Sequence, residues 1–330
     1  MNIFLAILML VGGFVLLIKG ADWFVDGASS IAKILKVPAI VIGLTIVALG
    51  TSLPEASVSI SSSIAGKNAL AVSNVVGSNI FNILVVLGAS ALIAPVRVQP
   101  GSIKKEIPFS ILCTIALLGA LLLGVNTVPP AEGAGEVVAR SYTLGLVGGL
   151  VLLAIFGFYM YWQISAALKA RHADTPEENT KVLSPVKSVI FIVIGIACII
   201  VGGNFVVDGA SAVAMKFGMS ETLVGMTIVA IGTSLPELVT SMVAAKKGES
   251  DLALGNAIGS NIFNIVFILG FSAVISPITV DILAIIDTVA VIGVSALVLL
   301  FSATGKKISR VEGGIMVAAY IGYFVYMFVR

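Results

Sequence analysis

Residues 46–55 read IVALGTSLPE, and residues 228–237 read IVAIGTSLPE, the same ten residues with a single change from Leu to Ile. Each copy places a proline and a glutamate inside a long apolar run, where a lipid bilayer accepts neither residue readily. Proline has no backbone N–H, so it leaves a carbonyl one turn earlier without its helical partner and breaks the helix. Two such breaks in one chain predict a membrane protein whose function depends on the broken segments.

The composition agrees with a chain that lies in a membrane. Of the 330 residues, 58% are hydrophobic and 11% are charged, and the mean hydropathy is +1.14, whereas soluble domains carry about 25% charged residues. A net charge of +2 gives no reason to expect a nucleic-acid partner. Cys113 and Cys198 lie in apolar runs and are predicted to be small buried residues. His172 lies in a polar loop and is predicted to be solvated.

Stretches of about 20 mostly apolar residues, the length that crosses the hydrocarbon core, predict ten membrane-spanning helices. They cover residues 2–22, 38–65, 69–94, 107–127, 143–167, 185–207, 220–245, 251–276, 283–303 and 311–329. The apolar start is interpreted as the first of these helices, because it lacks the basic segment and cleavage site of a signal peptide. The polar loop 168–184 then separates two halves of five helices each, residues 1–167 and 185–330.

The two halves are related by an internal repeat. Each position from Gly20 to Val96 has a counterpart 182 residues later without a gap, so that NVVGSNIFNI at residue 74 corresponds to NAIGSNIFNI at residue 256. A match of this length indicates a duplication. Because each half has an odd number of spans, the second half enters the membrane from the opposite side. The sequence therefore predicts an all-α integral membrane protein of two inverted five-helix repeats, with sites near the midplane where the repeats meet.

The positions of Lys and Arg predict the orientation, because these residues concentrate in cytoplasmic loops. With the N-terminus outside, most of them fall on the inner side. The outer loops and termini then hold few, namely Lys67, Arg140, Lys216 and Arg330. The predicted location is the plasma membrane, with the lipid bilayer as surroundings.

The broken segments supply oxygen atoms that could bind a cation. Thr51, Glu55 and Ser59 follow one another at intervals of four residues, so they share one helix face. Carbonyl oxygens freed by Pro54 and the negative end of the leading half-helix dipole are expected at the same place. A buried carboxylate usually marks an ion or proton path.

A second polar stripe lies on the next helix. Asn74, Ser78 and Asn82 recur at intervals of four residues, as do their copies at 256, 260 and 264. Such a stripe is also a common helix-packing device. Hydroxyl, amide and carboxylate oxygens, without His, Cys or Met nearby, favour Na⁺ or Ca²⁺ over Zn²⁺ or Cu⁺.

Charge balance narrows the cargo. Glu55 and Glu237 together would neutralise one Ca²⁺, and the same pair could instead hold two Na⁺. Competition for one pair of carboxylates makes the two cargoes mutually exclusive, which is the requirement for exchange. The acids Asp22, Asp26 and Asp208 lie near predicted span ends, where they are interpreted as partners of Lys19, turn caps or part of an ion vestibule.

The two GTSLPE segments, each followed by a GSNIFNI segment, resemble the paired signature repeats of the Ca²⁺/cation antiporter superfamily, most closely its prokaryotic sodium/calcium exchangers. In this sequence those repeats cover residues 43–96 and 225–278. The resemblance implies a ten-helix antiporter that exchanges Na⁺ for Ca²⁺ by alternating access, with the helices that begin near Asn2 and Pro185 sliding against the ion-binding core. The ion ligands that it implies are Ala48, Thr51, Ser52, Glu55, Ser78, Asn82, Ala230, Thr233, Ser234, Glu237, Ser260 and Asn264.

The resemblance also implies the roles of these residues. Glu55 and Glu237 would form the central Ca²⁺-binding pair, and the two alanines would contribute backbone carbonyls. Some members of the superfamily carry Asp where this chain has Asn264, so a third acid that would favour K⁺ transport is missing. The loop 168–184 is too short to hold the large cytoplasmic regulatory domains of animal exchangers.

The sequence thus predicts a transporter and not an enzyme, with Na⁺ and Ca²⁺ as substrates and no cofactor. It identifies no protein partner and is compatible with a monomer. An H⁺/Ca²⁺ exchanger of the same fold remains an alternative, because a carboxylate can serve either coupling ion. A Ca²⁺ channel is less favoured, since an inverted repeat within one chain is typical of alternating access. An intramembrane enzyme is disfavoured because no nucleophile–base pair is present.

Overall fold

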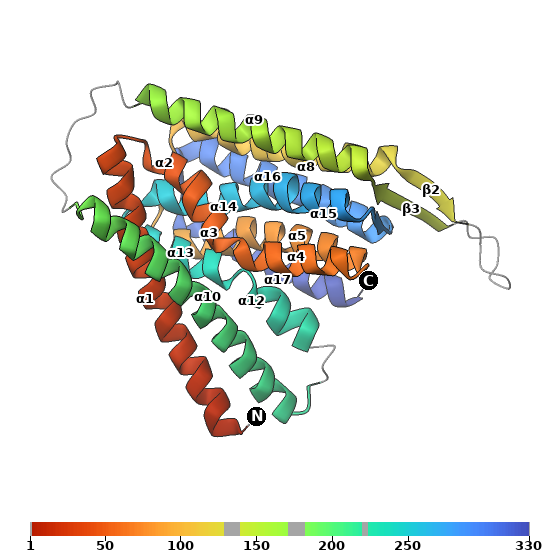
Figure 1. Ribbon diagram of the computed structural model, residues 1–330, viewed down its shortest axis with the longest axis horizontal. Helices are drawn as coiled ribbons and strands as arrows, with labels where there is room; N and C mark the ends of the chain where they lie inside the picture. The colour runs from red at the N-terminus through yellow and green to blue at the C-terminus, as the bar shows by residue number, and fades with distance from the viewer. Residues whose placement is uncertain (1, 129–138, 171–181, 220–223, 330) are drawn as a thin grey trace.

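Helices dominate the structure, a computed structural model that describes residues 2–128, 139–170, 182–219 and 224–329 (Figure 1). Segments written η are π-helical turns. The first half contains α1 (Ile3–Leu35), α2 (Ala39–Ile42), η1 (Gly43–Val47), α3 (Ala48–Thr51), α4 (Leu53–Ile64), α5 (Asn68–Phe81), η2 (Asn82–Val86), α6 (Leu87–Ile93), α7 (Pro100–Lys104), α8 (Glu106–Leu123) and α9 (Leu146–Ala170). The second half contains α10 (Pro185–Lys216), η3 (Gly225–Val229), α12 (Ala230–Gly232), α13 (Leu235–Lys246), α14 (Ser250–Ile262), η4 (Phe263–Leu269), α15 (Gly270–Ile275), α16 (Ile282–Gly305) and α17 (Arg310–Val329).

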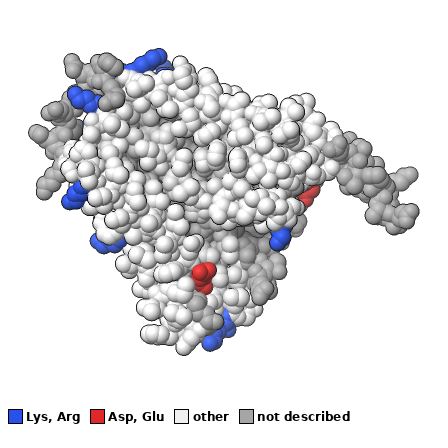
Figure 2. All heavy atoms as spheres, in the orientation of Figure 1, with Lys and Arg blue, Asp and Glu red and all other residues white. Residues whose placement is uncertain are grey.

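The helices have the length and composition of membrane spans. Within the described residues seven helical segments could cross a membrane, and an eighth forms if Ala39–Thr51 and Leu53–Ile64 count as one span with a 52° bend. On the face shown in Figure 2, charged side chains are few and lie scattered over a broad uncharged surface, as expected of helices that face lipid. The predicted architecture of ten helices in two inverted repeats fits this arrangement, although the range 220–245 begins outside the described residues.

Two helices run well past their predicted ends. α1 continues to Leu35, where Lys36 closes it in the left-handed conformation (φ 53°), and α10 continues to Lys216. The predicted ends at 22 and 207 were wrong because the acids in both segments lower the local hydropathy. Small residues nevertheless allow both helices to pack and continue.

α1 and α10 lie side by side along a line of small residues (Figure 1). A Cβ built on Gly13 would lie 2.8 Å from the carbonyl oxygen of Gly202, and one built on Gly195 would lie 2.8 Å from that of Gly20. Backbone contact this close leaves no room for a side chain at these positions, so glycine is required at them. The glycines are spaced seven residues apart, at 13, 20 and 27 in α1 and at 195, 202 and 209 in α10.

Short strands, which the sequence did not predict, join the helix ends. β1 (Val96–Arg97) pairs with β5 (Lys307–Ile308), and β3 (Ala139–Leu144) lies between β2 (Val125–Val128) and β4 (Ile278–Val280); all pairs are antiparallel. β2 occupies the end of the predicted span 107–127. A run of apolar residues this short does not distinguish a strand from the last turn of a helix.

The core of the molecule consists of the two segments that carry the Asn and Ser stripes. The segment from α5 to α6 and the segment from α14 to α15 are the most enclosed of the membrane-spanning segments, with 72% and 78% of their central residues buried. π-helical turns interrupt both at matching positions, η2 and η4, and a second matching pair, η1 and η3, precedes the two helix breaks. π-turns occur frequently at functional sites.

The two halves are not packed equally. α1 of the first half packs against α13 of the second, whereas the pair equivalent by the repeat, α10 of the second half and α4 of the first, has no comparable contact within the described residues. The polar loop 168–184, with His172, lies largely outside the described residues. Cys113 is buried, Cys198 is partly buried, and neither forms a disulfide among the described residues.

Candidate cation-binding site

The two helix breaks place Glu55 and Glu237 at the start of new helices. Ser52 has non-helical dihedral angles (φ −84°, ψ 8°) between α3 and α4, and Ser234 has nearly the same angles (φ −93°, ψ 6°) before α13. Each proline then occupies the first turn of the following helix, where a missing N–H costs nothing. Both glutamates lie in the first turn and are fully buried, with 0% of their surface exposed.

Each glutamate is bound by the serine at the break in the other repeat. Ser52 donates a hydrogen bond to Oε1 of Glu237 (2.9 Å), and Ser234 donates one to Oε1 of Glu55 (2.9 Å). The Ser234 hydroxyl also lies 3.1 Å from that of Ser78. Oε2 of each glutamate has no hydrogen-bond partner among the described residues. The inverted repeats thus bring the two carboxylates together and leave one oxygen of each available.

The first member of each Asn stripe stabilises the broken helix. Asn256 donates to the Ser241 hydroxyl (2.9 Å) and to the backbone carbonyl of Glu237 (3.2 Å), and its Oδ1 accepts a hydrogen bond from Thr51 (2.9 Å). Asn74 donates in the same way to Ser59 (3.0 Å). These contacts fix the turn that carries each glutamate.

The carbonyl of Ala48, which the resemblance implies as an ion ligand, takes part in the hydrogen bonds of its helix. It accepts a hydrogen bond from the backbone N–H of Ser52 (3.0 Å), and the hydroxyls of Thr51 and of Ser260 from the other repeat lie 3.3 Å and 3.5 Å away. The helix therefore keeps its hydrogen bonds up to Ser52, because Pro54 removes only the donor that would have served Gly50.

Asn82 and Asn264 each reach across the interface to the other repeat. Each donates its amide N–H to an asparagine that the sequence did not single out: Asn82 to Asn261 (3.1 Å) and Asn264 to Asn79 (3.0 Å). All four asparagines are fully buried. Oδ1 of Asn82 and of Asn264 has no hydrogen-bond partner among the described residues.

The predicted site residues therefore gather in one buried region, with two qualifications. Thr233 is half-buried, and of Ala230 only the backbone is described, as the first residue of α12. Within the described residues no three acidic, His or Cys side chains lie close enough to hold a metal ion. Oxygen atoms from two glutamates, serines and amides are the donors present, which suits a hard cation.

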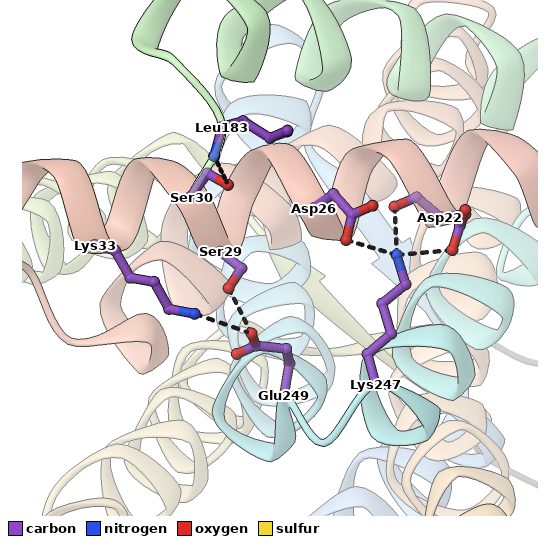
Figure 3. A network of polar contacts seen from close by, with 8 residues as sticks. All are labelled: Asp22, Asp26, Ser29, Ser30, Lys33, Leu183, Lys247 and Glu249. Carbon is purple, nitrogen blue, oxygen red and sulfur yellow. Dashed lines mark hydrogen bonds and ion pairs between the residues drawn. The ribbon is translucent and has the colours of Figure 1, made fainter. Parts of the chain in front are cut away.

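The acids at the periphery have a different partner from the one expected. Asp22 and Asp26 of α1 both form ion pairs with Lys247 (2.7 Å each), which follows α13 (Figure 3). Glu249 of the same connection accepts a hydrogen bond from Ser29 and lies 3.8 Å from Lys33. Among the interpretations left open by the sequence, a salt-bridge role is the one seen for Asp22 and Asp26, but the partner is Lys247 and not Lys19, because the α13–α14 connection, far away in the sequence, reaches α1. The corresponding acid of α10, Asp208, is exposed.

The fold and the site define a membrane protein built from two inverted repeats that enclose a buried cluster of carboxylate, hydroxyl and amide groups. The family model described as "Sodium/calcium exchanger protein" matches residues 5–165 and 187–329. The chain is 43% identical over 328 residues to the "Putative antiporter CaxA" of Alkalimonas amylolytica, covering 96% of each chain. It is 34% identical over 348 residues to the "Sodium/calcium exchanger MaX1" of Methanosarcina acetivorans, covering 97% of this chain and 98% of that one.

Solved structures point to the same family as the sequence relatives. The sodium-calcium exchanger NCX_Mj has a TM-score of 0.81 and 32% identity, covering 98% of this chain and 99% of that chain. The chain therefore belongs to the sodium/calcium exchanger family, within the Ca²⁺/cation antiporter superfamily, and it is a multi-pass membrane protein.

Proposed function

We propose that the protein is a secondary active antiporter that exchanges Na⁺ for Ca²⁺ across the plasma membrane by alternating access. Ca²⁺ would bind between Glu55 and Glu237. The observation that carries the proposal is the reciprocal pair of hydrogen bonds, in which Ser52 and Ser234 each hold one oxygen of the opposite glutamate and leave the other oxygen without a partner.

The charge of the site supports a divalent cargo. No Lys, Arg or His forms an ion pair with either glutamate within the described residues. A buried carboxylate without a counter-charge costs several kcal/mol, so two of them in one enclosed region favour the binding of cations or protons. One Ca²⁺ would neutralise both, and so would two Na⁺, but the two loads cannot occupy the same carboxylates together.

The unequal packing of the halves supports alternating access. Inverted repeats can exchange their conformations, so that the packing now seen at one end would form at the other. In the part of the chain that the structure describes, α1 packs extensively against α13, whereas α10 has no comparable packing on α4, which is the inequality expected of a structure open toward one side. The charge distribution of the loops supports an N-terminus on the outside.

The proposal needs no cofactor and no bond-making chemistry, because the ions are substrates. Both halves of the site come from one chain, so a single copy suffices for transport. The asparagine at position 264 supports Na⁺/Ca²⁺ exchange without K⁺, since it adds no third acid to the pair of glutamates.

Purified protein in liposomes tests the function. Vesicles loaded with Ca²⁺ and a fluorescent Ca²⁺ indicator are diluted into buffer with Na⁺, with a proton gradient but no Na⁺, or with neither. The proposal predicts Ca²⁺ efflux only when Na⁺ is outside. Efflux driven by the proton gradient alone would identify an H⁺/Ca²⁺ exchanger, and efflux without any counter-ion would identify a channel; either result would refute Na⁺ coupling.

A further inference from the structure

Four buried asparagines lie where the two repeats meet, and the predicted ligand set includes two of them, Asn82 and Asn264. We propose that the other two, Asn79 and Asn261, are positioning residues that turn the side-chain oxygens of Asn82 and Asn264 toward the cation site. This inference rests on the proposed function and adds residues to the same site.

Asn79 and Asn261 bind each other across the interface. The amide nitrogen of Asn79 donates to the backbone carbonyl of Asn261 (3.2 Å), and that of Asn261 donates to the backbone carbonyl of Asn79 (3.1 Å). A backbone carbonyl can only accept a hydrogen bond. The orientation of both amide groups is therefore fixed, with nitrogen toward the partner's backbone and oxygen on the opposite side.

This orientation determines the next pair. The oxygens of Asn261 and Asn79 accept hydrogen bonds from the amide nitrogens of Asn82 (3.1 Å) and Asn264 (3.0 Å). If Asn82 or Asn264 turned its amide group over, it would place oxygen against oxygen. The nitrogens of Asn82 and Asn264 are thus committed to the network, and their oxygens point away from it without a partner among the described residues.

The position of these two oxygens connects them to the glutamates. Asn82 lies one helical turn after Ser78, whose hydroxyl contacts the serine that holds Glu55. Asn264 follows Ser260 by the same interval in the other repeat. Both asparagines lie in π-helical turns, which are common at functional sites.

A network that only joined the repeats would look different. Buried polar groups in a packing device are normally all hydrogen-bonded. In this network every amide nitrogen has a partner, and so do the oxygens of Asn79 and Asn261, but those of Asn82 and Asn264 do not. Each repeat likewise contains one glutamate oxygen without a hydrogen-bond partner among the described residues, namely Oε2 of Glu55 and Oε2 of Glu237. These four buried oxygens, one amide and one carboxylate oxygen from each repeat, are the ones that the proposal assigns to the cation, although other buried hydroxyls such as those of Ser272 and Ser295 also have no partner among the described residues.

A double-mutant cycle separates positioning from packing. The full chain is purified in detergent, and CaCl₂ is titrated while thermal unfolding is recorded, because a ligand that binds the folded state raises its unfolding temperature. Asn261→Leu removes the acceptor of Asn82 and should raise the half-saturating Ca²⁺ concentration by about 10–100-fold, the effect typical of residues that orient a metal ligand. In a protein that already carries Asn82→Ala, Asn261→Leu should alter the half-saturating Ca²⁺ concentration by less than about twofold, because the oxygen that Asn261 positions is already absent.

An equal effect of Asn261→Leu in both backgrounds, or no effect in either, would overturn the proposal. If the Leu variant is not recovered folded, Asn261→Ser replaces it, since a buried serine can bond to its own helix and is too short to reach Asn82. The control is Ser90→Ala, which removes a buried hydroxyl that bonds only within its own helix (to Val86 O, 2.7 Å) and should leave Ca²⁺ affinity unchanged.

The readout also distinguishes the two proposals. If Ca²⁺ stabilises the wild type and Asn261→Leu lowers Ca²⁺ affinity only when Asn82 is present, the positioning role is supported even if liposomes show no Na⁺-driven Ca²⁺ flux. If Na⁺-driven flux is present and the cycle is additive, only the positioning role is refuted. A wild type that Ca²⁺ does not stabilise would refute the positioning role, and it would refute the proposed function as well if liposomes also show no Na⁺-driven Ca²⁺ flux.

Discussion

The hydrogen bond from Ser52 to Glu237 joins the two repeats at the proposed site, and removing it gives a prediction with a definite size. Ser52→Ala deletes a donor 2.9 Å from a fully buried carboxylate oxygen. Hydrogen bonds to charged groups contribute about 1.5–3 kcal/mol. Since 1.4 kcal/mol corresponds to a factor of ten, we expect Ca²⁺ affinity to fall by about 10–100-fold.

The assay is Ca²⁺-dependent stabilisation in detergent, followed by Na⁺-driven Ca²⁺ efflux from liposomes. Ser234→Ala, the matching change in the other repeat, should act in the same direction because its hydroxyl holds Glu55. Ser90→Ala is the control for loss of a buried hydroxyl elsewhere. If Ser52→Ala keeps the affinity of the wild type, or loses no more than the control, the serine does not support the ion-binding carboxylate and the reasoning fails.

Three further changes test other parts of the structure. Glu237→Gln keeps the volume of the side chain but leaves a bound Ca²⁺ with uncompensated charge, at a cost of several kcal/mol. Na⁺-driven Ca²⁺ transport should therefore disappear, although the variant still elutes as a folded protein in size-exclusion chromatography. Normal transport by this variant would contradict a shared carboxylate site. Gly20→Val should lower the free energy of unfolding by about 1–3 kcal/mol, measured by thermal unfolding, because a Cβ at this position would lie 2.8 Å from Cβ of Cys198. Gly12→Val is the control and should be neutral, since a Cβ there meets no atom within 4 Å. Equal effects of the two changes would argue against close packing of α1 on α10. Lys247→Met breaks two ion pairs whose side chains are 26–44% exposed, so stability should change by less than about 1 kcal/mol, and a larger loss would show that these pairs hold α1 in place.

The sequence predicts the repeat and the two glutamates because both depend on local chemistry. A duplication at a fixed offset can be recognised without any structure, and an odd number of spans per half inverts the second copy, so that sites are expected where the two copies face each other. A carboxylate directly after a helix-breaking proline is unusual inside a membrane-spanning segment, and each of the two copies contains one. Glu55 and Glu237 could therefore be singled out as a pair from the sequence alone.

The contacts between the repeats could not be predicted in the same way. Asn79 lies three residues before Asn82, so helical spacing places them near one face, but the stripe at intervals of four residues passes through Ser78 instead. The role of Asn79 depends on the backbone carbonyl of Asn261 across the interface, which no local pattern encodes. The ion pairs of Lys247 with α1 also join residues far apart in the sequence, so no local pattern could predict them.

The central claim is that Ca²⁺ and Na⁺ compete for one pair of carboxylates. Equilibrium binding of radioactive Ca²⁺ to the detergent-purified full chain, repeated at increasing Na⁺ with the ionic strength held constant by choline, tests it most directly. The account predicts a single Ca²⁺ bound per chain at saturation and its complete displacement by Na⁺. Ca²⁺ binding that Na⁺ leaves unchanged would contradict the claim, because the two ions would then occupy separate sites.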